Sequence, residues 1–173
     1  MKERSRVSVI GAICLSFSIA ATAQTNSPSP NAVQKGAEVT THAKGPFEVK
    51  LNPQTPDGNF EDATMGRMTI DKQFHGDLEA TSKGQMLSAM TDVKGSAGYV
   101  AMERVTGTLH GRSGSFVLQH SATMTRGVPQ LSVTVVPDSG TGQLVGLAGK
   151  MDLIITDGKH SYDFEYTLPA APR

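Results

Sequence analysis

The sequence contains no tryptophan, and aromatic side chains make up only 5% of its 173 residues. A stacking surface for single-stranded nucleic acid or for sugars needs such side chains, so neither kind of ligand is expected. The hydrophobic core must instead be built from valine, leucine, isoleucine and methionine, with a few phenylalanines and tyrosines. Together with 18 glycines, this composition favours one domain that is rich in β-strands and tight turns.

The chain has one cysteine, Cys14, which lies in an N-terminal region typical of a secretory signal peptide. Residues 1–23 begin with basic side chains, continue with an uncharged apolar run over 7–20, and end in Ala-Thr-Ala. This run is shorter than the roughly 20 residues that cross a bilayer, so we expect cleavage after Ala23 rather than a membrane anchor. The mature protein would be periplasmic or secreted, with no disulfide, and after removal of the signal peptide we expect no membrane partner.

Removal of residues 1–23 would also change the charge of the chain. The segment contains three basic residues and one acidic residue, so 13 basic and 15 acidic residues remain, with a formal net charge of −2. This balance excludes the basic surface that binds nucleic acid. Residues 24–44 are polar, include two prolines and have little to bury, which predicts a flexible linker before a single domain over 45–173.

Alternation of apolar and polar residues dominates the predicted domain. Eight strand-like runs are separated by turns such as Asp157-Gly158, the strongest hairpin signal in the sequence, and there is no amphipathic helix. Successive hairpins predict an antiparallel meander, and eight strands suffice to close a barrel that holds side chains or one small ligand. Closure removes exposed strand edges. We therefore expect a closed eight-stranded antiparallel barrel, with a two-sheet β-sandwich as the alternative.

Two runs depart from simple alternation. Lys72 falls on the apolar side of its run, so we expect either a β-bulge that shifts the register or a position near a barrel mouth. The run 129–136 is apolar on both faces, which indicates that a neighbouring molecule covers one of them. This second pattern favours a homo-oligomer.

Side-chain parity places polar and aromatic residues inside the barrel. The run 98–109 is ambiguous, because apolar residues occur at both parities. The majority favours Glu103 inward and Arg104 outward, and the opposite orientation is the alternative. A buried carboxylate needs a partner or a proton, and His120 or a tyrosine hydroxyl would supply one. The residues expected to line the interior and contact a ligand are Tyr99, Glu103, Phe116, Leu118, His120, His160, Tyr162 and Phe164.

The residues leave three functions open. The first is binding of a small, largely apolar ligand in the barrel interior. The second is a cofactor-free isomerase, cyclase or lyase, in which Glu103, His120 and either Tyr99 or Tyr162 perform acid–base chemistry. The third is an oligomerising protein without a catalytic role, in which the interior polar groups only fix the packing of the barrel.

Other chemical patterns in the sequence are weak. Residues 111–115 only partly match a G-x-S-x-G nucleophile elbow, and residues 142–150 lack the Ser or Thr that completes a phosphate-binding loop, so no cofactor is expected. His75, Asp77 and Glu79 alternate along one strand and could converge on a metal ion. Their face opposes an apolar one, however, so we expect a polar outer surface rather than a metal site.

Three long runs carry a resemblance to a known family: GRMTIDKQFHGDLEATSKGQMLSA, GYVAMERVTGTLHGRSGSFVLQHSATM and VVPDSGTGQLVGLAGKMDLIITDGKHSYDFEYTLP. They resemble the bacterial family called "domain of unknown function 3224" over nearly all of residues 45–168. The resemblance implies a small β-barrel similar to that of plant allene oxide cyclase. It does not imply that enzyme's activity, because the family has no established reaction or catalytic residues to carry over.

Overall fold

The structure is a computed structural model that describes residues 39–55 and 65–169. The expected signal peptide and residues 24–38 of the expected linker lie outside the described residues. Within the described ranges, no helix is long and apolar enough to cross a membrane.

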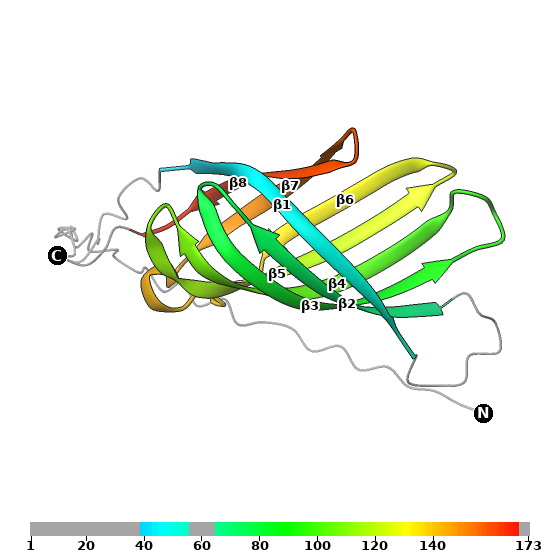
Figure 1. Ribbon diagram of the computed structural model, residues 1–173, viewed down its shortest axis with the longest axis horizontal. Helices are drawn as coiled ribbons and strands as arrows, with labels where there is room; N and C mark the ends of the chain where they lie inside the picture. The colour runs from blue at the N-terminus through cyan, green and yellow to red at the C-terminus, as the bar shows by residue number, and fades with distance from the viewer. Residues whose placement is uncertain (1–38, 56–64, 170–173) are drawn as a thin grey trace, which may run out of the picture. The chain divides into compact units, whose positions relative to one another are not determined.

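Eight antiparallel strands form a closed barrel in chain order, and the last strand pairs with the first (Figure 1). The prediction of a closed eight-stranded antiparallel barrel is therefore confirmed, and the β-sandwich is excluded. The only helical element in the described residues is a single 3-10 turn. The strands are β1 (Thr41–Gln54), β2 (Met65–Phe74), β3 (Leu78–Met90), β4 (Ala97–Leu109), β5 (Arg112–Thr125), β6 (Val128–Val135), β7 (Ala148–Thr156) and β8 (Lys159–Thr167), and the 3-10 turn is η1 (Gly142–Leu144).

Strand β1 begins at Thr41 rather than at Gly45, so the end of the expected linker belongs to the barrel. Residues 41–46 form the antiparallel pairing with β8 that closes the barrel, and Ala43 is fully buried. The sequence does not indicate that β1 begins at Thr41, because residues can pair through the backbone without a pattern of apolar side chains. On the outer surface, Asp163 lies 2.7 Å from both His42 Nδ1 and Lys44 Nζ.

The hairpin connections give the barrel two distinct ends. Two-residue turns join β4 to β5 and β7 to β8, and His110, Gly111, Asp157 and Gly158 all have the positive φ that such turns require. Because the strands run up and down, the β2–β3, β4–β5 and β6–β7 connections share one end, which we call the closed end. The β3–β4, β5–β6 and β7–β8 turns share the opposite end, which we call the open end.

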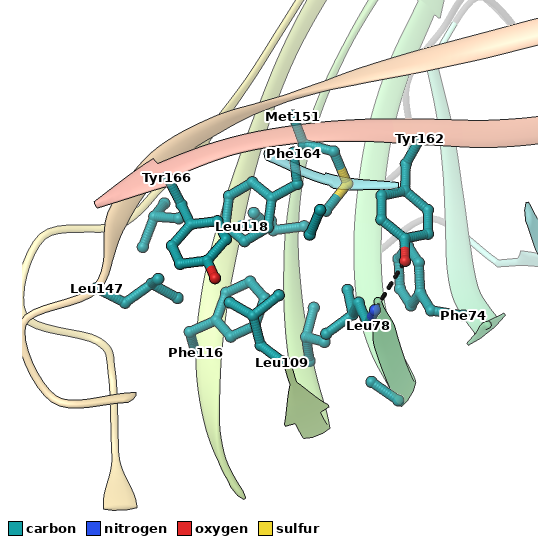
Figure 2. Packing of buried hydrophobic residues seen from close by; sticks show 14 of the residues in the cluster. Phe74, Leu78, Leu109, Phe116, Leu118, Leu147, Met151, Tyr162, Phe164 and Tyr166 are labelled. Carbon is teal, nitrogen blue, oxygen red and sulfur yellow. Dashed lines mark hydrogen bonds between the residues drawn. The ribbon is translucent and has the colours of Figure 1, made fainter. Parts of the chain in front are cut away.

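The closed end is filled by one hydrophobic cluster (Figure 2). The rings of Phe116 and Phe164 stack there with 5.7 Å between their centroids. Leu144 and Leu147 are buried in the same cluster, so the β6–β7 connection covers this end of the barrel. The residues labelled in Figure 2 are Phe74, Leu78, Leu109, Phe116, Leu118, Leu147, Met151, Tyr162, Phe164 and Tyr166.

Strand β6 does not have the two apolar faces that the sequence suggests. Val133 and Val135 are buried, whereas Ser132 and Thr134 are exposed. Val136 lies beyond the end of the strand, and its presence in the run caused the appearance of a second apolar face. This strand therefore supplies no argument for an oligomer. It is also weakly joined to β7, because Thr134 and Lys150 form the only register pair between the two strands.

Candidate functional site

Four polar side chains from four consecutive strands meet inside the barrel. Lys72 comes from β2, Ser82 from β3, Glu103 from β4 and His120 from β5, and all four are buried. Lys72 and Ser82 are direct partners across β2 and β3, and the other two occupy the next rows toward the open end. We call these four residues the polar cluster.

The carboxylate of Glu103 is the centre of the polar cluster. Its Oε2 accepts a hydrogen bond from Lys72 Nζ at 2.8 Å, and its Oε1 accepts one from the Ser82 hydroxyl. Oε2 also lies 2.9 Å from His120 Nε2. That contact is not aligned as a hydrogen bond, and among the described residues the buried Nε2 has no aligned hydrogen-bond partner.

These contacts keep Glu103 ionised. Burial by itself would raise the pKa of this carboxyl group, but His120, the charge and hydrogen bond of Lys72, and the hydrogen bond from Ser82 together lower the pKa to about 2. Because its pKa is low, the group has no proton to donate at neutral pH and is a weak base. Both of its oxygens are also already engaged by other groups. Glu103 is therefore suited to neutralising Lys72 rather than to transferring protons.

Lys72 lies inside the barrel without a bulge, contrary to both sequence-based alternatives. The β2–β3 register is unbroken from Met65 to Phe74, and the side chain is buried rather than at a mouth. Its ammonium group lies 5.3 Å from the ring centroid of Phe47 and 5.6 Å from that of Phe74. The lysine is tolerated on an apolar face because Glu103 and these two rings replace water around the charge.

Tyr99 is half-buried between the polar cluster and the open end. It packs against the small apolar cluster of Ile70, Met86 and Ala101. Burial, followed by the negative charge of Glu103, raises the pKa of its hydroxyl. Tyr99 therefore carries a neutral hydroxyl within the electrostatic influence of Glu103.

Tyr162 serves a different purpose at the closed end. Its hydroxyl accepts a hydrogen bond from the Leu78 backbone N–H at 2.9 Å (Figure 2). It donates another to the His75 carbonyl at 3.0 Å. Burial raises the pKa of Tyr162 to about 12, the Leu78 hydrogen bond opposes this rise, and the charges of Asp77 and Glu79 add to it. The main chain of the β2–β3 region therefore uses this hydroxyl fully.

The remaining residues that were expected in the interior contribute to packing. Phe116, Leu118 and Phe164 are fully buried in the closed-end cluster. His160 is half-buried, and its ring centroid lies 5.2 Å from that of Phe47. Of the eight expected interior residues, only Glu103 and His120 belong to the polar cluster. Sequence reasoning missed Lys72 and Ser82, although a lysine on an inward face beside an inward glutamate was a usable signal.

His75, Asp77 and Glu79 stand on the surface around the β2–β3 turn. The Asp77 carboxylate accepts a hydrogen bond from the Lys44 backbone N–H at 2.9 Å, and the Glu79 carboxylate accepts one from the Gly76 N–H at 2.8 Å. These acidic groups stabilise the turn. In the part of the chain that the structure describes, no group of three or more histidine, cysteine or acidic side chains could hold a metal ion.

At the open end, the inner face of the barrel carries large apolar side chains that are not covered. Each of them points to the same side of its strand as residues that are buried nearer the closed end. Leu131, for example, points to the same side of β6 as the buried Val133 and Val135. Their exposed fractions range from 41% to 67%. We call this set the open inner face; it comprises Leu51, Met90, Met124, Leu131 and Ile155.

A separate hollow of about 1150 Å³ lies on the outside of the barrel wall. Its lining comes from β2–β5 and includes the outward side chains of Gln85, Met102 and Arg104. Glu103 and His120 border it only from behind, because their side chains point into the barrel. The polar cluster is therefore not part of this hollow.

The described residues thus define a class of protein: a closed antiparallel β-barrel with one packed end, one open end and a buried polar cluster between them. A family model described as "Protein of unknown function (DUF3224)" matches residues 43–166, and the chain belongs to this family. The expected family membership is confirmed.

Three solved chains match, and one of them is similar along most of this chain. It is the crystal structure of a protein with unknown function from the DUF3224 family of Shewanella oneidensis MR-1, with 51% sequence identity and a TM-score of 0.73. The match covers 77% of this chain and 100% of the Shewanella chain. No protein among the curated sequences matches.

Proposed function

We propose that this protein is exported and binds a small, largely apolar molecule against the open inner face. The observation that carries the proposal is the contrast between the two ends of the barrel. The inner face is buried at the closed end, whereas five large apolar side chains on the same face are 41–67% exposed at the open end. Exposed apolar surface that is concentrated on a concave wall is the usual mark of a ligand site.

The polar cluster forms the base of this proposed site. His120 lies opposite Ala101, and the next row toward the open end contains Tyr99 and Leu131 on either side of Ala122. Because the charges of Lys72 and Glu103 neutralise each other, the base of the site does not require a charged ligand. Tyr99 adds one hydroxyl that can orient a polar atom of the ligand.

The contacts of two of the four candidate catalytic residues, Glu103 and Tyr162, favour binding over catalysis. Glu103 is ionised and has both oxygens engaged, and the Tyr162 hydroxyl is engaged by the main chain at the closed end. Neither group is poised to exchange a proton with a molecule at the open end. We therefore assign the polar cluster a role in holding the barrel together beneath the ligand.

Uptake of a neutral apolar dye tests the binding proposal. Leu131→Asp places a charge on the open inner face, and Ser132→Asp places the same charge on the outer face of the same strand. We expect Nile red fluorescence titrations to show at least roughly tenfold weaker binding for Leu131→Asp and unchanged binding for Ser132→Asp. Absence of dye uptake by the unchanged protein, or equal uptake by both variants, would refute the proposal.

Export is tested separately by the mass of the protein. When the full chain is expressed in a Gram-negative host, we expect the periplasmic fraction to contain a protein that begins at Gln24. Intact mass spectrometry distinguishes this form from the uncleaved chain. An uncleaved protein confined to the cytoplasm would contradict the export proposal and leave the dye experiment unaffected.

A further inference from the structure

His120 is the member of the polar cluster that makes no aligned hydrogen bond within the described residues. Lys72 and Ser82, by contrast, both donate hydrogen bonds to Glu103. The side chain of His120 is nevertheless only 3% exposed. Buried polar groups in folded proteins almost always have a partner. An unused imidazole at the base of the proposed ligand site therefore indicates where a polar atom of the ligand binds.

The position of Glu103 determines which ring nitrogen of His120 carries a hydrogen. The ionised Oε2 lies 2.9 Å from Nε2, and a lone pair on Nε2 would repel that oxygen. A hydrogen on Nε2 is attracted to it instead. Because Lys72 already neutralises Glu103, protonation of both ring nitrogens would leave an uncompensated buried charge. The ring is therefore neutral, with its hydrogen on Nε2 and a lone pair on Nδ1 that can accept a hydrogen bond.

The surroundings of His120 differ between its two sides. Toward the closed end, Leu118 is fully buried in the hydrophobic cluster. Toward the open end, the next inward residue of β5 is Ala122, which is partly exposed, and the direct partner of His120 in β4 is Ala101. Two small side chains thus leave the ring accessible from the side of the open inner face.

A hydrogen-bond donor lies next to this acceptor. Tyr99 is the direct partner of Ala122 and is two residues from Ala101, so Tyr99 and His120 are diagonal neighbours on the inner face of the barrel. Burial and the charge of Glu103 raise the pKa of the Tyr99 hydroxyl, which therefore keeps its hydrogen. The base of the proposed site offers one acceptor and one donor, and neither is used by the described part of the chain.

We propose that the ligand of the open inner face is an apolar alcohol, whose hydroxyl donates its hydrogen to Nδ1 of His120 and accepts one from Tyr99. This inference rests on the proposed function and names the class of its ligand. A hydroxyl is neutral and both donates and accepts through one oxygen. A ketone or an ether has no hydrogen for Nδ1, and a carboxylate would bring a second negative charge toward Glu103.

Displacement of Nile red by two isomers tests the proposal on the unchanged protein. n-Octanol and heptyl methyl ether contain the same atoms, but only the alcohol has a hydrogen to donate. In a purely apolar site the ether would bind at least as well, because its oxygen is less costly to remove from water. We expect the alcohol to displace the dye at a roughly tenfold lower concentration, which is the effect of about one net hydrogen bond.

Three variants assign this preference to a residue. His120→Leu removes the acceptor, so the two isomers should displace the dye equally. Tyr99→Phe removes a donor that serves both isomers, so both should bind roughly two- to tenfold more weakly, with the alcohol still preferred. Tyr162→Phe is the matched control, because this hydroxyl is engaged at the closed end, and it should leave both affinities unchanged.

Nuclear magnetic resonance of the imidazole nitrogens tests the proposal without a variant. In protein with isotope-labelled histidine, we expect His120 to carry a hydrogen on Nε2 and none on Nδ1. Addition of n-octanol should shift the Nδ1 resonance, and addition of heptyl methyl ether should not. A hydrogen on Nδ1, or equal shifts with both isomers, would overturn the proposal.

Dye uptake separates this proposal from the binding proposal on which it rests. If Nile red binds but the alcohol and the ether displace it equally, recognition of a hydroxyl is refuted and the apolar site remains. A preference for the alcohol that persists in His120→Leu likewise refutes the role of His120. If the unchanged protein takes up no dye, the apolar site is refuted and its alcohol ligand with it.

Discussion

Lys72 and Glu103 stand 31 residues apart in the sequence and form a buried ion pair, with 2.8 Å between Nζ and Oε2. The pair connects β2 to β4, and Ser82 on the intervening β3 donates a hydrogen bond to the same carboxylate. Three consecutive strands are thus held by one carboxylate. Because a buried charge is costly without its partner, the pair specifies how these strands align.

Removing one charge of this pair should destabilise the barrel severely. Glu103→Gln leaves the Lys72 ammonium buried without a counter-ion, so we expect a loss of about 3–5 kcal/mol in the free energy of unfolding. Urea denaturation measures this loss. The double variant Lys72→Met/Glu103→Gln should lose less than the sum of the two single variants, because neither unpaired charge remains.

The control for this experiment is an exposed ion pair. Lys83 Nζ lies 3.7 Å from Asp71 Oδ1 on the outer surface of β2 and β3. Lys83→Met should change the stability by no more than about 0.5 kcal/mol, because water already solvates both charges. A Glu103→Gln variant that is as stable as Lys83→Met would show that the buried pair is not required for the fold.

The stability of the barrel should fall in acid for the same reason. The pKa of Glu103 is about 2 in the folded protein, against an ordinary value of 4.5. A lowered pKa stabilises the fold fully above the ordinary value, and the stabilisation is lost as the pH falls from about 4.5 toward 2. The lowered pKa of Glu103 contributes about 3 kcal/mol to the free energy of unfolding. Denaturation at a series of pH values measures it.

Comparison with Glu103→Gln isolates the contribution of this carboxyl group. Asp163 also titrates in acid, because hydrogen bonds from Lys44 and His42 hold its pKa below the usual range. That effect is present in both proteins and cancels in the difference. The variant should therefore show a flatter dependence on pH below 4.5, and parallel curves would contradict the assignment.

Much of the barrel follows from local alternation in the sequence. Parity along β4 and β5 correctly places Glu103 and His120 inside, because in a strand each residue's direction is set by its immediate neighbours. The same argument misjudges Lys72. Its partner lies two strands away, and parity gives no information about which inward residues of different strands come into contact.

The difference in exposure between the two ends of the barrel could not be predicted from the sequence. Leu131 and Val133 are both apolar and point to the same side of β6, yet Leu131 is exposed and Val133 is buried. The difference arises because the closed end is covered by Leu144 and Leu147, whereas no described element covers the open end. The exposure of an inward side chain depends on which segment covers that end of the barrel. The alternation within a strand gives no information about that segment.

Tyr162 provides a prediction about the closed end. Tyr162→Phe keeps the packed ring but leaves the Leu78 N–H and the His75 carbonyl without their partner, so we expect a loss of about 1–3 kcal/mol in stability. Tyr99→Phe is the control, because its hydroxyl makes no hydrogen bond within the described residues. Dye uptake by Tyr162→Phe should match that of the unchanged protein; a large loss of uptake at normal stability would move this hydroxyl into the ligand site.

The last prediction concerns the glycine that faces Glu103. Gly84 is the direct partner of Glu103 across β3 and β4, and a Cβ at this position would lie 2.6 Å from the Met102 carbonyl oxygen and 3.1 Å from the Glu103 Cα. The clash is with backbone, which cannot rotate away, so Gly84→Ala must push β4 outward and displace the carboxylate from Lys72. We expect a loss of about 1–3 kcal/mol in thermal or urea denaturation.

Gly98→Ala is the matched control on the same strand pair. A Cβ at Gly98 would meet nothing nearer than the Ala122 carbonyl oxygen at 3.5 Å, which is an ordinary van der Waals contact. This variant should be neutral or more stable by up to about 1 kcal/mol, since alanine restricts the unfolded chain more than glycine does. Equal stability of the two variants would mean that β3 and β4 can separate at Gly84 without cost, and the close approach would then not be what positions Glu103.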